Sequence, residues 1–154
     1  MASACQPHHF LAVMKDGRSA IATTTGNQIC HITLRGGTRS NYGAASVEAA
    51  CGLARQSGLT PVVIIDASHA NSVKDPEHQP LVMEGVGRQI AGDRRIIGIM
   101  IESYLVGGRQ DLVSGRPLTY GQSITDSCID WDTSVTVLER LVAAVAQRRG
   151  VVAD

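Results

Sequence analysis

Short apolar runs alternate with segments of helical periodicity through most of the chain. The runs at residues 61–65 and 96–101 are continuously apolar, a pattern typical of strands buried on both faces of a parallel sheet. Apolar residues between and after these runs recur at the spacing of a helix. We expect strands at residues 29–34, 61–66 and 96–101, and helices at residues 45–57, from Asp75 to before Gly92, and from Asp132 or Thr133 to Arg149. This alternation predicts an α/β fold with a parallel sheet.

The last helix has the clearest pattern of the three. Its predicted buried stripe consists of Val135, Leu138, Val142 and Val145, which recur three to four positions apart. The arginines in its last turn suit the negative end of the helix dipole, and Gly150 is a suitable stop.

A β-hairpin is predicted before the first α/β unit, over about residues 8–26. Two alternating segments, HFLAVM and SAIATTT, flank KDGR. The Asp16-Gly17 pair is the dipeptide that a tight two-residue turn favours, because both of its central residues need a positive φ. We treat residues 1–154 as a single domain, and the hairpin as a part of it.

Polar residues follow each predicted parallel strand. Arg35 comes after the first strand, His69 after the second and Glu102 after the third. Right-handed crossovers bring the C-terminal ends of such strands to one edge, where α/β proteins carry their chemistry. A long loop over residues 103–130 adds Asp126, and its length predicts a functional or disordered segment.

These side chains suit a metal site for an anionic substrate. His69, Glu102 and Asp126 are ligands for a divalent metal such as Mn²⁺, Fe²⁺, Co²⁺ or Zn²⁺. Arg35 can bind a phosphate or carboxylate through two hydrogen bonds. The alternatives are a loop histidine hydrogen-bonded to its neighbours, a solvated glutamate and a turn-forming aspartate. The joint placement of the residues favours the functional interpretation.

Composition and charge limit the kinds of binding partner that we expect. The 154 residues carry 14 basic and 14 acidic side chains without a block of like charge, which favours neither a nucleic acid nor an anionic membrane as partner. The apolar runs are far shorter than the roughly 20 residues of a membrane-spanning helix, and the N-terminus lacks a signal-peptide pattern. Four separated cysteines without a C-x-x-C pair suit reduced thiols. We therefore expect a cytoplasmic protein.

Four segments resemble a known enzyme family. HITLRGG, IDASHANS, IIGIMIESYLVGGRQ and LTYGQSITDSCIDW occur in the order and spacing of the C-terminal part of type I 3-deoxy-D-arabino-heptulosonate 7-phosphate (DAHP) synthase. The resemblance implies a (β/α)8 TIM barrel that condenses phosphoenolpyruvate with erythrose 4-phosphate in the first step of the shikimate pathway. It also implies a divalent metal cofactor.

The resemblance assigns roles to the residues already gathered. It implies that His69, Glu102 and Asp126 bind the metal and that Arg35 binds the phosphate of phosphoenolpyruvate. The metal would polarise the aldehyde of erythrose 4-phosphate during attack by the enol carbon. Water then adds and phosphate leaves. Asp126 or a water on the metal can take the proton in that step, and the sequence leaves both open.

Part of the family pattern does not occur in this chain. The cysteine ligand of the first barrel strand and the KPRTS-like and GART-like segments belong to the N-terminal half of the family. We therefore expect the last three β/α units of a barrel, preceded by the hairpin, with activity that requires a complementary N-terminal half. The complete enzyme is expected to be a homo-oligomer.

Two other interpretations remain at this point. The chain could be a non-catalytic fragment or a regulatory module that binds an aromatic amino acid near Phe10, Ala12 and Ala22 of the hairpin. A weaker interpretation takes His69, Glu102 and Asp126 as an unrelated metal hydrolase site, which only the three ligands support.

Overall fold

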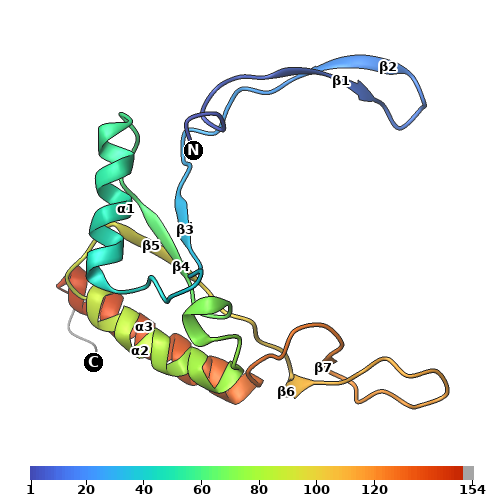
Figure 1. Cartoon of the computed structure of the whole chain (residues 1–154), viewed down its shortest axis with the longest axis vertical. Helices are drawn as coiled ribbons and strands as arrows, with labels where there is room; N and C mark the ends of the chain where they lie inside the picture. Colours follow the sequence, from blue (N-terminus) through green and yellow to red (C-terminus); the bar gives the residue numbers. More distant parts are fainter. Residues whose placement is uncertain (151–154) are drawn as a thin grey trace.

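The computed structural model describes residues 1–150, and the predicted single domain therefore extends by four residues beyond the described part. A central body contains a parallel sheet of three strands in the order β3-β4-β5. Its strands are β3 (Ile32–Leu34), β4 (Val63–Asp66) and β5 (Ile96–Met100), and its helices are α1 (Ala44–Gln56), α2 (Gln79–Ile90) and α3 (Trp131–Arg149). The predicted alternation of strands and helices around a parallel sheet is confirmed (Figure 1).

The apolar runs of the strands form the core of this body. Val63 and Ile65 of β4 are fully buried, and Ile96 of β5 is 2% exposed. Val47 of α1 and Val86 of α2 pack into the same cluster. The continuous apolar pattern reflects burial on both faces for the middle strand β4, whereas in the edge strand β5 the side chain of Ile97 is 52% exposed.

Helix α3 differs in register from the prediction. Its N-cap is Asp130, whose side chain accepts a hydrogen bond from the backbone N–H of Thr133 at 2.8 Å, so the cap predicted at Asp132 or Thr133 was wrong. The predicted stripe was also wrong in part, because Leu138 is 47% exposed and Val142 is 68% exposed. The buried residues are Ser134, Val137, Leu141 and Ala144. The helix is apolar on two sides, and residues 1–150 cover only one of them.

The segment after β4 begins with two short 3-10 turns. They are η1 (Ala70–Ser72) and η2 (Pro76–His78). Asp75 caps η2 through the backbone N–H of Glu77, but the α-helix begins only at Gln79. The helix predicted from Asp75 is therefore divided into a 3-10 turn and α2.

The hairpin extends from the body as an arm (Figure 1). It contains β1 (His9–Val13) and β2 (Ser19–Thr23), which pair in antiparallel fashion. The predicted two-residue turn was wrong. Gly17 alone has a positive φ of 82°, and its N–H donates to the carbonyl of Met14 at 2.9 Å, which gives a longer loop. The regulatory site expected near Phe10 on this arm stays a prediction.

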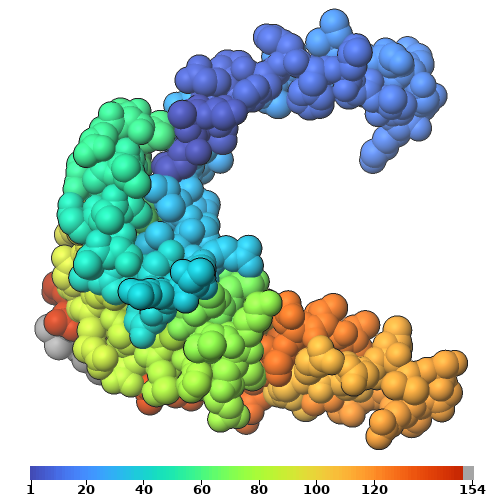
Figure 2. Space-filling model, viewed as in Figure 1, coloured from blue at the N-terminus to red at the C-terminus, as the bar shows by residue number. Residues whose placement is uncertain are grey.

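A second arm replaces the predicted long loop. It contains β6 (Val106–Arg109) and β7 (Gln122–Ser123), which form a small parallel sheet. The Gln110 side chain holds this arm together, since its Nε2 donates to the carbonyls of Thr119 at 2.8 Å and Gln122 at 3.0 Å. Figure 2 shows the two arms projecting from the body so that the molecule has a C-shaped outline.

The sequence was expected to contain no membrane-spanning helix. Among the helices of residues 1–150, none combines the length and the apolar character needed to cross a membrane.

Candidate active site

The loop after β4 presents His69 in a fixed orientation. Asp66, the last residue of β4, is 1% exposed, and its Oδ2 lies 2.7 Å from Nδ1 of His69. The other carboxylate oxygen, Oδ1, accepts hydrogen bonds from the N–H and the hydroxyl of Ser68, both at 2.9 Å. The hydrogen bond expected from the alternative interpretation is therefore present. It occupies only one ring nitrogen and leaves Nε2 directed elsewhere.

Glu102 faces this free nitrogen from the end of β5. Its Oε1 lies 4.0 Å from Nε2 of His69, which is too long for a hydrogen bond. Burial raises the pKa of Glu102, the negative charge of Asp126 raises it further, and His69 partly opposes the rise. Burial and the neighbouring Asp126 therefore both disfavour the charged form of this carboxylate.

A buried side chain of α2 fixes the backbone of Glu102. Gln79 is 1% exposed, and its Oε1 accepts the N–H of Glu102 at 2.9 Å while its Nε2 donates to the carbonyl of Glu102 at 3.2 Å. These two hydrogen bonds pair with the backbone of Glu102 as a neighbouring β-strand would. Sequence reasoning missed Gln79, because a glutamine at the start of a helix is usually a surface residue.

Asp126 joins the same small cavity from the second arm. The cavity has a volume of about 30 Å³. It is lined by Ser68, His69, Lys74, Glu102, Asp126 and Ser127. The three predicted ligands thus line one cavity, although they come from three separate segments.

Lys74 is a cavity residue that the sequence analysis did not identify. Val73 and Lys74 have φ values of 59° and 60°, in the left-handed region that non-glycine residues rarely adopt. The N–H of Lys74 donates to the carbonyl of His69 at 2.9 Å, which closes the turn. Without a glycine at either position, the sequence carries no signal for this turn. Such strain is frequent at functional sites.

Arg35 lies at the same sheet edge but is not part of the cavity lining. It is exposed and follows β3 directly. Gly36 has a φ of 75°, and a Cβ placed there would lie 2.8 Å from the Cβ of Ala70. The glycine after Arg35 is therefore needed for contact with the loop of His69.

The amide of Asn71 connects these two loops. It is 5% exposed, and its Nδ2 donates to the carbonyl of Leu34 at 3.0 Å and to that of Asp66 at 2.7 Å. Its Oδ1 accepts the N–H of Asn41 at 2.7 Å. One buried side chain thereby fixes the ends of β3 and β4, which precede Arg35 and His69.

The side chains of this cavity are of the types that bind a divalent cation, but they do not form a complete metal site by themselves. Within residues 1–150, no three His, Cys, Asp or Glu side chains lie close enough together to hold a metal ion. Two bonds of about 2.1 Å can nevertheless span the 4.0 Å between His69 Nε2 and Glu102 Oε1. The carboxylate of Asp66 on the far ring nitrogen is the usual support of a metal-binding histidine.

Comparisons with known proteins identify the family of the chain. Residues 1–139 match the model of the DAHP synthetase I family. The phospho-2-dehydro-3-deoxyheptonate aldolase of Haemophilus influenzae is 52% identical over 145 residues, which are 93% of this chain and 40% of the relative. The Phe-sensitive enzyme of the same name from Escherichia coli K12 is 50% identical, over 94% of this chain and 41% of the relative.

A solved structure shows the same fold. The phospho-2-dehydro-3-deoxyheptonate aldolase of Francisella tularensis SCHU S4 is 44% identical with a TM-score of 0.90, over 96% of this chain and 43% of that protein. The chain spans about 40% of the length of the curated relatives that it matches. On these findings, the chain belongs to the DAHP synthetase I family.

Proposed function

We propose that this chain is the C-terminal part of a metal-dependent 3-deoxy-7-phosphoheptulonate synthase, an aldol-type transferase. The substrates would be phosphoenolpyruvate and erythrose 4-phosphate. The observation that carries the proposal is the single cavity where His69, Glu102 and Asp126 meet, at the sheet edge that also bears Arg35. The high identity to enzymes named phospho-2-dehydro-3-deoxyheptonate aldolase supports the choice of reaction.

Each residue of the site has a role in this proposal. His69, Glu102 and Asp126 would hold a divalent cation, which when bound supplies Lewis acidity at the aldehyde of erythrose 4-phosphate. Asp66 keeps the His69 ring in place through Nδ1. Arg35 binds the phosphate of phosphoenolpyruvate, since a guanidinium matches a phosphate with two hydrogen bonds.

A carboxylate near the reacting carbon accepts the proton in this reaction. Asp126 is exposed and lines the cavity, so it can accept a proton from the water that adds before phosphate leaves. Glu102 is less suitable, because its backbone is held by Gln79 and its side chain faces His69. We therefore assign the base to Asp126.

The rest of a (β/α)8 barrel would complete the site. We interpret β3, β4 and β5 with their helices as the last three units, because the sheet ends at β3 and at β5 without a further partner among the described strands. The outer side of α3 and β5 forms an open apolar groove of about 460 Å³. It is lined by Ile99, Leu138, Leu141, Val142, Val145, Ala146 and Arg149.

A strand and a helix from a complementary N-terminal half fit this uncovered surface. Unpaired edges of a parallel sheet favour the addition of another strand. The missing three fifths of the relatives' length is enough to supply it. A full barrel has about 250 residues, well above the length of this chain.

A complementation experiment tests this proposal. The chain is mixed with the remaining N-terminal part of the Haemophilus influenzae relative, and sugar phosphate formation from both substrates is measured with Mn²⁺. We expect activity above that of either part alone, and loss of that activity with His69→Ala. The matched control is His78→Ala, which changes an exposed histidine at the end of η2.

Sedimentation of the mixture separates assembly from catalysis. A complex that forms and remains inactive with Mn²⁺ would contradict the proposed reaction. A mixture that does not form a complex would contradict the proposed completion of the barrel.

A further inference from the structure

Two segments lie side by side at the base of the hairpin arm. The N–H of Asn27 donates to the carbonyl of Ala4 at 2.8 Å, and Nε2 of Gln28 donates to the carbonyl of Cys5 at 3.0 Å. Gly26 makes this approach possible, because a Cβ at this position would lie only 2.3 Å from the Cys5 oxygen. The two segments are therefore held in a defined register.

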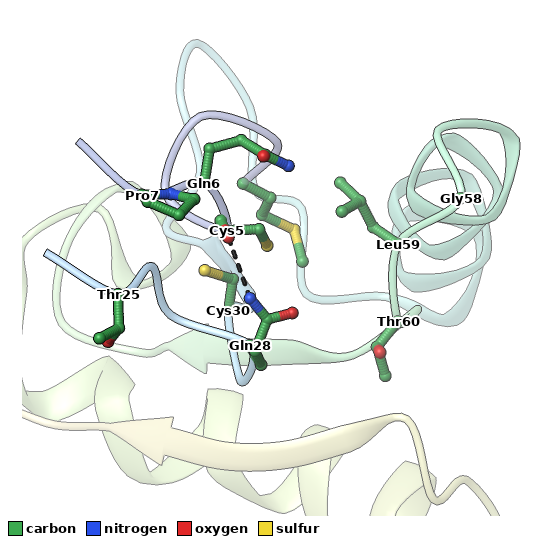
Figure 3. A pocket seen from close by; sticks show the side chains of 10 residues that line it. Cys5, Gln6, Pro7, Thr25, Gln28, Cys30, Gly58, Leu59 and Thr60 are labelled. Atoms are coloured by element: carbon green, nitrogen blue, oxygen red, sulfur yellow. Dashed lines mark hydrogen bonds between the residues drawn. The ribbon is translucent and has the colours of Figure 1, made fainter.

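This register brings two thiols into one cavity. Cys5 is half-buried and Cys30 is 8% exposed. Both line an open cavity of about 410 Å³ beside Gln28, as Figure 3 shows. The Cys30 thiol donates to the carbonyl of Asn27 at 2.9 Å, and burial and the neighbouring Cys5 raise its pKa.

The remaining cysteines have different surroundings. Cys51 is fully buried in the core on α1, and Cys128 belongs to the second arm. All four cysteines are free thiols in the structure. Cys5 and Cys30, by contrast, line one cavity that is open to solvent.

We propose that Cys5 and Cys30 form a redox-sensitive modification site, which a peroxide converts to a disulfide. This inference is independent of the proposed synthase activity. It rests on the shared cavity and on the hydrogen bonds that hold residues 4–5 against residues 27–28.

The reaction has two steps. Cys5 is the more accessible thiol, and its sulfur attacks a peroxide oxygen, which gives a sulfenic acid and releases one water. The Cys30 sulfur then displaces the hydroxyl group from the sulfenic sulfur, and its proton leaves with that group as a second water. Two thiols lose two electrons and the peroxide gains them. Cys30 is the resolving thiol, since it is only 8% exposed and lines the same cavity as Cys5.

The new bond would fix the base of the arm. It closes a ring that contains all of β1 and β2, so the arm could no longer separate from the segment before β3. A covalent ring of this kind restricts the unfolded chain more than the folded one. Oxidation would thereby change the direction and freedom of a surface that bears exposed apolar side chains.

Peptide mapping tests the site directly. The folded chain is treated with hydrogen peroxide, free thiols are alkylated, and the chain is digested with trypsin without reduction. Trypsin cuts after Lys15, Arg18 and Arg35, which places Cys5 in peptide 1–15 and Cys30 in peptide 19–35. We expect these two peptides to appear as one linked species that separates on reduction.

Variants and an unfolded control make the result specific. Cys5→Ser should abolish the linked species, and Cys128→Ser should leave it unchanged. Treatment in urea should reduce its yield at least several-fold relative to other cysteine pairs. Alkylation of both Cys5 and Cys30 after peroxide treatment would overturn the proposal. Oxidation of Cys5 to a sulfonic acid without the link would also overturn it.

Discussion

The body and the hairpin arm use similar apolar residues with opposite results. In β4 the residues Val63 and Ile65 are fully buried, whereas in the arm Leu11 is 83% exposed and Ile21 is 73% exposed. The body covers its strands with helices, but the arm has no second layer. A two-stranded hairpin by itself is at best marginally stable in water. The comparison shows which parts of the chain complete their own packing and which require a further surface.

Helix α3 shows the same contrast within one element. Val137 and Leu141 pack into the core, whereas Val142 lies in the open groove of the opposite side. Exposed apolar surface of this extent usually marks an interface. Both uncovered regions therefore agree with a chain that is one part of a larger assembly.

The largest difference in the free energy of unfolding between body and arm is expected when one isoleucine in each is replaced by alanine. Ile65→Ala removes a side chain that is fully buried and should lower the free energy of unfolding by about 2–5 kcal/mol. Ile21→Ala, the same change on the arm, should alter it by less than about 0.5 kcal/mol. Urea denaturation of both variants measures the difference. Equal losses would mean that the arm is as well packed as the body.

The second prediction concerns the support of Glu102. Gln79→Ala leaves the backbone N–H of Glu102 without a partner, whereas the carbonyl keeps its bond from the N–H of Ile129 at 3.0 Å, and the change should cost about 1–3 kcal/mol. Gln147→Ala, a change at an exposed position of α3, should have an effect below about 0.5 kcal/mol.

A volume control separates packing from hydrogen bonding at this position. Gln79→Met keeps most of the side-chain volume but cannot pair with the backbone. We expect it to be nearly as unstable as Gln79→Ala in the same urea experiment. Recovery of wild-type stability with Met would show that Gln79 acts by filling space alone.

The body could be predicted from the sequence because its signals are local. Continuous apolar runs predicted β4 and β5, and apolar residues at helical spacing predicted α1 to within one residue at each end. The side of α3 that faces the core could not be predicted, because Leu138 and Leu141 are equally apolar and only tertiary contact decides between them. The small sheet of β6 and β7 was missed, since its strands contain glycine and polar residues.

The site could be predicted as far as strand ends determine it. His69 and Glu102 converge because both follow parallel strands, and the sequence shows that order. Asn71 and Gln79 support the site through contacts distant in sequence, so no local pattern indicates them. The metal-ligand and substrate roles of His69, Glu102, Asp126 and Arg35 stay predictions.

The third prediction uses two ion pairs with identical spacing. Asp93–Arg95 in the body and Asp16–Arg18 in the hairpin turn are both bonded at 2.7 Å between an Nη2 and an Oδ2. Hydrogen bonds from Arg95 hold the pKa of Asp93 below its ordinary value, although burial opposes this. Asp93→Asn should therefore cost about 1 kcal/mol at pH 7, and Asp16→Asn less than about 0.5 kcal/mol.

The pH dependence of stability follows from the lowered pKa of Asp93. The stabilisation is fully present above the unfolded-state pKa of about 3.9 and is lost as the pH falls through the lower folded-state value. The difference between wild type and Asp93→Asn should therefore shrink when urea denaturation is repeated near pH 2. A difference that persists there would assign the effect to packing instead of charge.

The smallest effect on stability is expected on the outer side of α3. Val142 is 68% exposed, so Val142→Lys should change the free energy of unfolding by less than about 0.5 kcal/mol. The same charge placed in the apolar groove should weaken the association with the N-terminal half at least tenfold, because burial of an unpaired ammonium is unfavourable. Leu81→Lys, at a position on α2 that is 62% exposed and does not line the groove, is the matched control. Sedimentation of each mixture measures the difference, and equal association of both variants would show that the partner does not cover this groove.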